Sequence, residues 1–246
     1  MNWQEHIASV SESGKKQLAI LLDPDKLVDS GMRQMVLRMI NAAEVDMVFV
    51  GGSLIVDADY HATVEAIRKD CNKPVFLFPG SATQLTPHVD AVLLLSLISG
   101  RNADLLIGQH VLAAPQIRKW NLQTISTGYM LVDCGNPTTA SYISATLPIP
   151  HNKPEIAAVT AMAGEMIGNR LIYLDGGSGA KVPVSPEMIS RVKQSVRVPL
   201  IVGGGIRTYH DAQSAWDAGA DILVIGTAVE ENPDLLFDLC NARNHC

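Results

Sequence analysis

The sequence has few cysteines, no excess of positive charge and no long hydrophobic run. Its four cysteines among 246 residues form neither a C-x-x-C pair nor another zinc-like spacing, which predicts a reducing compartment and therefore a cytoplasmic protein. The polar N-terminus, MNWQEHIASVSESGKKQ, lacks the apolar core of a signal peptide. No apolar run approaches the roughly 20 residues of a membrane span, although transient contact with a membrane surface stays open.

The charge balance limits the class of partner. Lys and Arg number 19 against 25 Asp and Glu, which gives a formal net charge of −6. A protein whose main partner is DNA or RNA carries a basic surface, so nucleic acid is not expected. Hydrophobic residues make up 47% of the chain and no linker interrupts it, which predicts one domain over residues 1–246.

Short apolar segments recur along the whole chain, each bounded by Gly, Pro, Ser or Asp. They are continuously apolar rather than alternating, which is typical of strands covered on both faces in a parallel sheet. The eight segments are Leu18–Leu22, Asp46–Val50, Pro74–Phe78, Ala91–Leu95, Gly128–Val132, Leu171–Leu174, Pro199–Val202 and Ile222–Ile225. With helices between them they predict a (β/α)8 TIM-type barrel, and a doubly wound open sheet is the alternative.

Helices are predicted where apolar residues recur at i, i+3, i+4 and i+7. One such stripe follows Asp29 or Ser30, either of which can cap the helix, and two others begin near Pro154 and Pro186. The stripes are Met32, Met35, Val36, Met39 and Ile40; Ile156, Val159, Thr160, Ala163 and Ile167; and Met188, Ile189 and Val192. We expect each stripe to pack on the barrel.

The connection between the third and fourth strands is unusually short. Its sequence, PGSATQLTPHVD, contains two prolines and no helical stripe. A parallel crossover that includes a helix needs a dozen or more residues, so the third helix is predicted to be replaced by an extended connection. The segments 96–127 and 133–170 are long instead, and such loops carry specificity in these barrels.

Three glycine-rich segments follow the last three predicted strands. They read YLDGGSGA from Tyr173, GGGIR from Gly203 and GTA from Gly226. A phosphate needs several N–H donors that converge on it, and glycine lets the backbone approach closely and adopt positive φ. Each segment alone can be an ordinary tight turn. Three in succession at the strand ends predict a phosphate-binding cradle.

The first strand ends in Asp23-Pro-Asp25-Lys, and the second ends in a segment that contains Ser53. An Asp-Pro turn that opens a helix explains the first motif equally well. Mg²⁺ takes one or two carboxylates and keeps water and substrate phosphates as its other ligands. Asp23 with the Ser53 hydroxyl therefore forms a candidate sparse magnesium site for a diphosphate.

Several of these motifs, taken in order, resemble those of the geranylgeranylglyceryl phosphate synthases. The blocks are LLDPDK after the first strand, FVGGS after the second, YLDGGSGA after the sixth and GGGIR after the seventh. PIPHNKPEIA, before the sixth helix, resembles the longer of that family's two groups. The resemblance covers most of the chain, and it implies a barrel without its third helix.

The resemblance also implies an activity: a prenyltransferase of ether-phospholipid biosynthesis. Such an enzyme joins sn-glycerol 1-phosphate to geranylgeranyl diphosphate, or to a polyprenyl diphosphate of another length, and releases pyrophosphate. It implies Mg²⁺ at Asp23 and Ser53, and a homo-oligomer is expected. The implied substrate-binding residues are Tyr173, Leu174, Asp175, Gly176, Gly177, Ser178, Gly179, Gly204, Gly205, Gly226 and Thr227.

Two positions depart from the family pattern. Asp175 stands where the family usually has Glu, so the carboxylate is one methylene shorter and the geometry at this point is in doubt. Leu21 stands where the other group has lysine, which supports the longer group. Asp175 and Tyr173 are the candidate catalytic residues: Tyr173 holds the glycerol, and Asp175 either accepts the hydroxyl proton or only orients the hydroxyls.

Other residues have weaker expectations. A prenyl tail needs an apolar groove, for which the candidates double as ordinary core: Leu97, Ile98, Leu105, Leu106, Ile107, Val111, Tyr129 and Met130. His110 and His210 are expected to be solvent-exposed, and Asp133 is expected to face the barrel mouth. Arg207 either helps the phosphate or pairs with Asp211 four residues later.

Rival functions share parts of this pattern. A sugar-phosphate isomerase would use carboxylates at the first and fifth strands, where Asp23 and Asp133 stand, but it would also need glycine motifs after the third and fourth. A Schiff-base aldolase would need lysine where Asp175 stands. A non-catalytic binder of a phosphorylated ligand would keep the cradle and need neither Asp23 nor Ser53.

Overall fold

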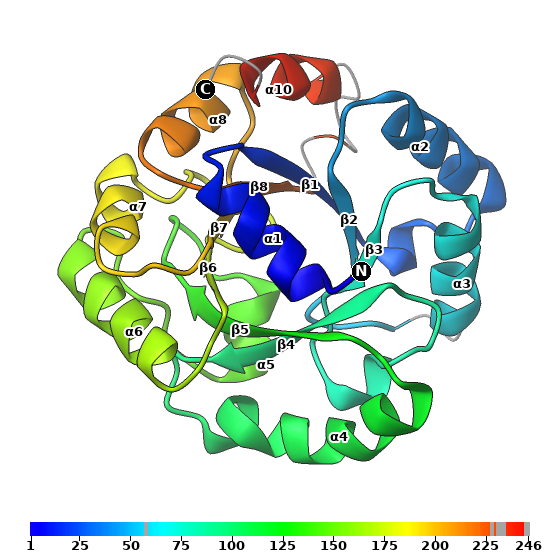
Figure 1. Ribbon diagram of the computed structural model, residues 1–246, viewed down its shortest axis with the longest axis horizontal. Helices are drawn as coiled ribbons and strands as arrows, with labels where there is room; N and C mark the ends of the chain where they lie inside the picture. Colours follow the sequence, from blue (N-terminus) through cyan, green and yellow to red (C-terminus); the bar gives the residue numbers. More distant parts are fainter. Residues whose placement is uncertain (57–58, 227–228, 230–234, 244–246) are drawn as a thin grey trace.

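The computed structural model of residues 1–246 describes residues 1–56, 59–226, 229 and 235–243. Eight parallel strands close into a barrel in chain order, with β1 paired to β8 (Figure 1). They are β1 (Gln17–Leu22), β2 (Met47–Val50), β3 (Val75–Leu77), β4 (Ala91–Leu97), β5 (Thr124–Leu131), β6 (Leu171–Asp175), β7 (Leu200–Gly203) and β8 (Ile222–Ile225). The predicted barrel is confirmed, and the open doubly wound sheet is wrong.

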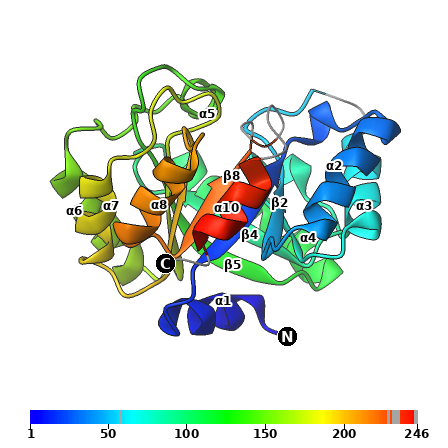
Figure 2. The same ribbon diagram turned by 90° about the horizontal axis from the view of Figure 1, so that it is seen from above.

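Helices surround the barrel, and the first helix closes one end of it. They are α1 (Trp3–Glu12), α2 (Ser30–Ala42), α3 (Tyr60–Asp70), α4 (Gln109–Trp120), α5 (Thr139–Ser144), α6 (Pro154–Met166), α7 (Pro186–Lys193), α8 (Tyr209–Asp217) and α10 (Leu235–Arg243). Figure 2 shows α1 at one end and α5 at the opposite end, above the carboxyl ends of the strands. Among the described residues, no helix is both long and apolar enough to cross a bilayer.

Local side-chain bonds fix where the helices begin. The Asp29 carboxylate accepts a hydrogen bond from the N–H of Met32 at 2.7 Å, so Asp29 rather than Ser30 caps α2. Ser185 caps α7 in the same way through the N–H of Met188. These oxygens satisfy donors that a helix start leaves without a partner, which is why short polar residues stand there.

The predicted helical stripes have three different outcomes. In α7 the stripe is correct, because Met188, Ile189 and Val192 are all buried. In α2 it is correct at Val36 and Ile40, which pack on the barrel with Leu37. Met32 and Met35 at the start of that stripe are exposed, so the prediction is wrong there.

The stripe of α6 faces solvent, so the prediction is wrong for this helix. Ile156, Val159 and Ile167 are 45%, 56% and 74% exposed. The buried face consists of small residues such as Ala161 and Gly164 instead. A Cβ on Gly164 would lie 2.6 Å from the Cδ1 of Ile98, so α6 packs too close to the barrel for larger side chains.

The missing third helix is confirmed. Between β3 and β4 the chain forms only a short 3-10 turn, Ala82–Gln84. The buried Gln84 amide anchors this connection, because it donates to the carbonyl of Gly52 at 3.1 Å and accepts from the N–H of Gly80 at 2.8 Å. The connection therefore lies against the end of β2 and leaves the flank of β3 and β4 without a helix.

The barrel interior contains a series of aromatic rings. Phe76 and Phe49 have ring centroids 6.1 Å apart, and Phe49 lies 6.5 Å from Phe78. Phe78 then contacts both Tyr129, at 5.7 Å, and Tyr173, at 5.6 Å. This packed interior closes the barrel below the site and brings two phenol groups to the mouth.

Candidate active site

A polar cavity of about 1240 Å³ lies at the carboxyl ends of the strands. Most of the residues predicted from the strand ends line it: Asp23, Ser53, Tyr173, Asp175, Gly177, Ser178, Gly179, Gly204, Gly205 and Gly226. The structure therefore brings together side chains and loops from β1, β2, β6, β7 and β8. Thr227 lies outside the described residues.

Two residues of the predicted substrate-binding set, Leu174 and Gly176, do not line the cavity. Leu174 is fully buried in the outer layer of the core, because alternate residues of a strand point to opposite faces. Gly176 lies behind the mouth, where its N–H donates to the carbonyl of Gly203 at 2.9 Å. A Cβ at Gly176 would lie 2.9 Å from the sulfur of Cys134, so this glycine serves close packing.

The glycine loops of β6 and β7 are packed against each other at positive φ. The φ angles of Gly177, Gly204 and Gly205 are 81°, 83° and 75°. A Cβ at Gly204 would lie 2.7 Å from the nitrogen of Gly177, and one at Gly205 would lie 2.4 Å from the carbonyl oxygen of Val182. Glycine is therefore required for both the turn and the close approach.

The same loops present donors to the cavity. In the described part of the chain, the N–H groups of Gly204 and Gly205 have no protein acceptor, although both residues line the cavity. Backbone N–H groups at a concave turn of this kind attract an anion. These glycines thus form tight turns, and their N–H groups lie where the sequence predicts a phosphate.

The Arg207 side chain holds the loop that follows β6. Its guanidinium donates to the carbonyl oxygens of Ala180, at 2.7 Å, and Lys181, at 3.1 Å. Asp211 instead accepts from the backbone N–H of Arg207 at 3.0 Å, so the predicted pairing of the two side chains is wrong. Arg207 also lines the cavity and adds positive charge beside the glycine loops.

Asp175 is buried at the floor of the cavity and has two donors. The hydroxyl of Tyr129 donates to Oδ2 at 2.5 Å, and the N–H of Gly177 donates to Oδ1 at 2.7 Å. Burial raises the pKa of Asp175 from its ordinary value, and the two hydrogen bonds lower it by less. The result is a fixed carboxylate of increased basicity that faces the cavity.

The two tyrosines beside Asp175 stay protonated. Burial, and then the neighbouring Asp175 charge, raise the pKa of Tyr129 and of Tyr173 well above the ordinary value. Their rings lie 5.4 Å apart in an edge-to-face contact. The sequence predicted that Tyr129 lines the prenyl groove and gave no sign of its hydrogen bond to Asp175. That bond becomes visible only once β5 is paired with β6.

The two carboxylates after β1 have different roles. Asp23 Oδ1 accepts from the N–H of Asp25 at 3.1 Å, and the same oxygen would lie 3.8 Å from a Cβ on Gly52. Asp23 thus caps the 3-10 turn Pro24–Lys26 and also faces the cavity beside Ser53. Asp25 accepts from the N–H of Val56 at 2.9 Å and fastens that loop instead.

The carboxylate of Asp23 and the hydroxyl of Ser53 suit a magnesium ion, and they are too few to hold a metal whose ligands all come from the protein. Among the described residues, no three His, Cys, Asp or Glu side chains lie close enough to hold a metal together. One carboxylate beside one hydroxyl suits a hard cation that keeps water and substrate oxygens as its other ligands. Lys26, which sequence analysis did not single out, also lines this part of the cavity.

An apolar groove of about 870 Å³ continues from the polar cavity. Both are lined by Gly52, Ser53, Phe78 and Ala140, so they meet at the ends of β2 and β3. The groove runs along β4 between the connection that replaces the third helix and α4. A third barrel helix would fill this flank, so its absence creates the groove.

The predicted groove residues are correct in part. Leu97, Leu105 and Tyr129 line the groove, whereas Ile107 and Val111 are exposed. Ile98 and Met130 pack in the outer core, and Leu106 lies outside the lining. The missed lining residues are mainly leucines of β4, the connection after β3 and α5: Leu85, Leu93, Leu94, Leu95 and Ile143. In an apolar strand the sequence does not show which side opens onto a groove.

Other expectations changed as well. His110 is not solvent-exposed as expected: it lines the groove, and its Nε2 lies 2.8 Å from the carbonyl oxygen of Leu95. His210 is exposed as predicted. Asp133 is exposed outside the lining of the cavity and accepts from the N–H of Gly135, so it does not face the barrel mouth.

Solved structures share the architecture of this chain. One is a crystal structure of (S)-3-O-geranylgeranylglyceryl phosphate synthase from Thermoplasma acidophilum in complex with sn-glycerol-1-phosphate. It superposes with a TM-score of 0.92 at 28% identity and covers 100% of both chains. A thiamine phosphate pyrophosphorylase from Pyrococcus furiosus, with a TM-score of 0.60 at 12% identity, shares the fold alone.

Sequence comparisons agree with the structural ones. Geranylgeranylglyceryl phosphate synthase from Spirosoma linguale is 52% identical over 92% of this chain and 91% of its own length. The same-named protein from Thermococcus kodakarensis is 42% identical over 86% of this chain and 83% of its own. The model of the PcrB family matches residues 12–242. The chain therefore belongs to the PcrB family, together with the geranylgeranylglyceryl phosphate synthases to which it is similar.

Proposed function

We propose that this protein is a geranylgeranylglyceryl phosphate synthase. It joins sn-glycerol 1-phosphate to geranylgeranyl diphosphate, or to a polyprenyl diphosphate of another length, forms an ether and releases pyrophosphate. The observation that carries this proposal is that the polar cavity and the apolar groove meet at Ser53 and Phe78. One cavity suits a small phosphorylated alcohol, and the other suits a long apolar tail.

The glycine cradle is the proposed site of the glycerol phosphate. Gly204 and Gly205 would supply backbone donors to the phosphate, together with the Gly177–Gly179 loop and Gly226 after β8. Tyr173 lies in the cavity below them and is proposed to hold the glycerol. This arrangement leaves the glycerol hydroxyls on the side of Asp175.

The prenyl diphosphate is proposed to lie across the junction, with its tail in the groove. Asp23 and Ser53 would hold Mg²⁺ against the diphosphate, and this ion would balance the charge of the leaving group. Lys26 lines the same part of the cavity and adds positive charge there. The reacting prenyl carbon would then lie between the magnesium site and Asp175.

Asp175 is the proposed acceptor of the hydroxyl proton. The alternative is that it only orients the glycerol hydroxyls. Burial raises its pKa, which makes the carboxylate a stronger base than an exposed one, and this supports the proton-acceptor role. The donors from Tyr129 and Gly177 hold it in place, which makes a shorter Asp workable where the family usually has Glu.

The rival functions fit the site less well. A sugar-phosphate isomerase with a second carboxylate at β5 is disfavoured, because Asp133 is exposed outside the cavity. A non-catalytic binder of a phosphorylated ligand would need the cradle but not the groove that opens into it.

We propose that the exposed stripe of α6 mediates homo-oligomer formation. Ile156 and Val159 on α6, and Ile167 at its C-cap, are exposed apolar residues, while the other face of this helix already packs on the barrel. Exposed apolar patches typically mark protein contacts. Ile156→Glu together with Val159→Glu should lower the mass measured by sedimentation equilibrium. The same two charges at exposed positions of other helices, Ser9→Glu with Ala62→Glu, should leave it unchanged.

Transient contact with a membrane surface is proposed at the helices that border the groove. Val111 and Leu112 on α4 and Tyr142 on α5 are exposed, while His110 and Ile143 on the same helices line the groove. A prenyl tail could enter the groove between them. The variant with both Val111→Glu and Leu112→Glu should co-sediment less with vesicles than the unchanged protein. That result would support membrane contact at α4.

One assay tests the activity. The protein is incubated with Mg²⁺, labelled sn-glycerol 1-phosphate and prenyl diphosphates of several lengths, and the extracted lipid is analysed for the ether. We expect an ether product and one pyrophosphate per ether, with the preferred length set by the groove. No product with any length would overturn the proposed synthase activity.

A further inference from the structure

The closed end of the barrel contains a third cavity, of about 450 Å³ and partly open to solvent, on the far side of the barrel from the mouth. It lies between α1 and the beginnings of β1, β2 and β3. Trp3, His6, Ile7 and Val10 line it from α1, at the i, i+3, i+4 and i+7 positions of one helix face. Figure 1 shows α1 crossing this end of the barrel.

Three of the ten residues that line the cavity carry aromatic rings: Trp3, His6 and Phe76. The Trp3 indole contacts the Phe76 ring edge-to-face with centroids 5.2 Å apart, and it contacts the His6 ring at 5.8 Å. Pro74 and Met47 complete the apolar part of the lining. A flat ring of similar size is the shape that such walls accommodate.

One buried polar group in this cavity lacks a partner. Gln17 is the first residue of β1, lies two residues before the inward-facing Ala19, and is only 2% exposed. Among the described residues, its Nε2 has no hydrogen-bond partner. A buried amide donor without a partner destabilises the folded protein, so an acceptor in the cavity would remove that cost.

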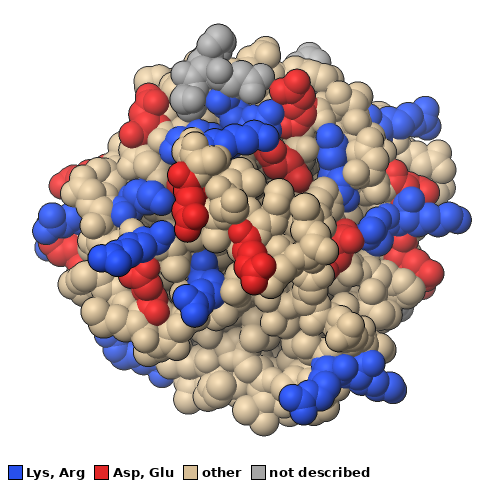
Figure 3. All heavy atoms as spheres, viewed as in Figure 1, with Lys and Arg blue, Asp and Glu red and all other residues tan. Residues whose placement is uncertain are grey.

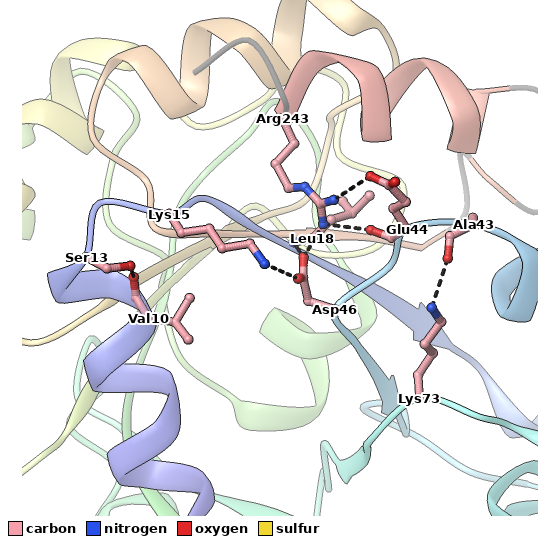
Figure 4. A network of polar contacts seen from close by, with 9 residues as sticks. All are labelled: Val10, Ser13, Lys15, Leu18, Ala43, Glu44, Asp46, Lys73 and Arg243. Atoms are coloured by element: carbon pink, nitrogen blue, oxygen red, sulfur yellow. Dashed lines mark hydrogen bonds and ion pairs between the residues drawn. The ribbon is translucent and has the colours of Figure 1, made fainter.

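The polar rim of the cavity is already paired. Asp46 lies 3.7 Å from the Lys15 ammonium, accepts from the N–H of Leu18, and forms an ion pair with Arg243 of α10 (Figure 4). Arg243 also donates to the Glu44 side chain at 3.2 Å. Around α1, positive and negative side chains are interspersed on the surface (Figure 3). The rim therefore presents no strong net charge, and Lys15 is its exposed cation.

We infer that this cavity binds a small aromatic compound that carries an amide or carboxylate oxygen on its ring. The ring lies against Trp3 and Phe76, and the oxygen accepts from Gln17 Nε2. A carboxylate would gain an additional interaction with Lys15, whereas an amide would not. Binding would hold α1 on the barrel, and it is independent of the proposed synthase activity because it uses the opposite end of the molecule.

The test is to titrate the whole protein with benzamide, benzoate and benzylamine. The NMR signal of the Gln17 side-chain amide reports binding. Benzamide and benzoate should shift that signal and saturate, and benzylamine, which has no acceptor oxygen, should not. Gln17→Leu should weaken binding of both about tenfold, the value of one hydrogen bond. Tighter binding of benzoate, lost in Lys15→Met, would identify the carboxylate as the better ligand.

A matched pair of substitutions on α1 guards against a folding defect in the Gln17 variant. Val10→Trp places an indole inside the cavity, and Ser9→Trp places the same side chain on the exposed neighbouring position. Binding should be lost in Val10→Trp and kept in Ser9→Trp. Equal binding to Val10→Trp and Ser9→Trp would overturn the inference, and so would a response to benzylamine equal to that of benzamide. It would also be overturned by crystal structures in which neither benzamide nor benzoate displaces an ordered water from Gln17.

Discussion

The two cavities that meet at Ser53 are built in opposite ways. The polar cavity consists of loops in which glycine is required, because Gly204 and Gly205 have positive φ and no room for a Cβ. The apolar groove exists because a helix is missing, and its walls are ordinary leucines of β4. The first cavity has strict requirements for residue type, and the second requires only space and apolar character.

This difference predicts how the two sites tolerate change. Single atoms matter in the polar cavity, because donors and charges must point at fixed positions. In the groove, volume matters more than identity, because apolar contacts are non-directional. Substitutions should therefore act on turnover and phosphate affinity in the first, and on the choice of prenyl length in the second.

The largest effect is expected at Asp23. Asp23→Ala removes the carboxylate proposed to hold Mg²⁺ and should lower turnover by about 10³-fold, since such an ion stabilises the leaving group by several kcal/mol. Binding of glycerol 1-phosphate, measured by calorimetry, should stay unchanged. Asp25→Ala is the matched control, because Asp25 fastens the loop from outside the cavity lining. Equal losses in the two variants would remove the metal assignment.

Asp175 should have the second largest effect. Asp175→Asn keeps the size of the side chain but removes the base, and kcat should decrease about 10²-fold. Asp175→Glu should restore part of the rate, because the family usually has Glu at this position. If Asp175→Asn raised KM for glycerol 1-phosphate and left kcat unchanged, the residue would orient the substrate and accept no proton.

The glycine cradle gives a sharper comparison within the polar cavity. Gly205→Ala would place a Cβ 2.4 Å from the Val182 carbonyl oxygen, whereas Gly179→Ala meets nothing within 4 Å at nearly the same φ. KM for glycerol 1-phosphate should rise about 20-fold in the first variant, the value of one hydrogen bond to a charged group. Steady-state kinetics with both substrates should show a much smaller rise for Gly179→Ala. An equal rise would point to backbone strain rather than to the cradle.

The sequence predicted the polar cavity better than the groove, for a physical reason. A phosphate cradle needs glycines and a metal site needs a carboxylate, so residue type reveals Gly204, Gly205 and Asp23. The barrel and its missing helix were predictable because apolar runs and a connection of a dozen residues limit the topology. These features depend on composition at fixed places along the chain.

The predictions were wrong where an apolar residue could lie on either of two faces of its helix or strand. The stripe of α6 has correct helical spacing, but alanines and a glycine pack on the barrel while Ile156 and Val159 face solvent. Met130 was expected in the groove and lies in the outer core, because one strand contributes to both faces. Periodicity gives the element, but packing distance and strand face decide which side is buried.

The groove is best tested by filling it. Ala113 on α4 is buried and lines the groove, so Ala113→Phe should raise KM for geranylgeranyl diphosphate about tenfold and affect a shorter prenyl diphosphate less. Ala114→Phe makes the same change at an exposed position of α4 outside the groove lining and serves as control. Competition between two prenyl lengths in one reaction measures the preference directly. An unchanged preference in Ala113→Phe would place the tail elsewhere.

The smallest effect is expected at the hydrogen bond from Tyr129, which lines the groove, to Asp175, which lines the polar cavity. This hydrogen bond stabilises the charged carboxylate and so lowers the pKa of Asp175, against the burial that raises it. Tyr129→Phe should therefore raise that pKa further, and the acid limb of the kcat profile should move to higher pH. Well above this limb, kcat should change by no more than about threefold, because Gly177 still holds the carboxylate. If the acid limb moved to lower pH, or stayed in place while KM for the prenyl diphosphate rose, Tyr129 would act in the groove alone. The groove would then have no influence on the pKa of Asp175 through this residue.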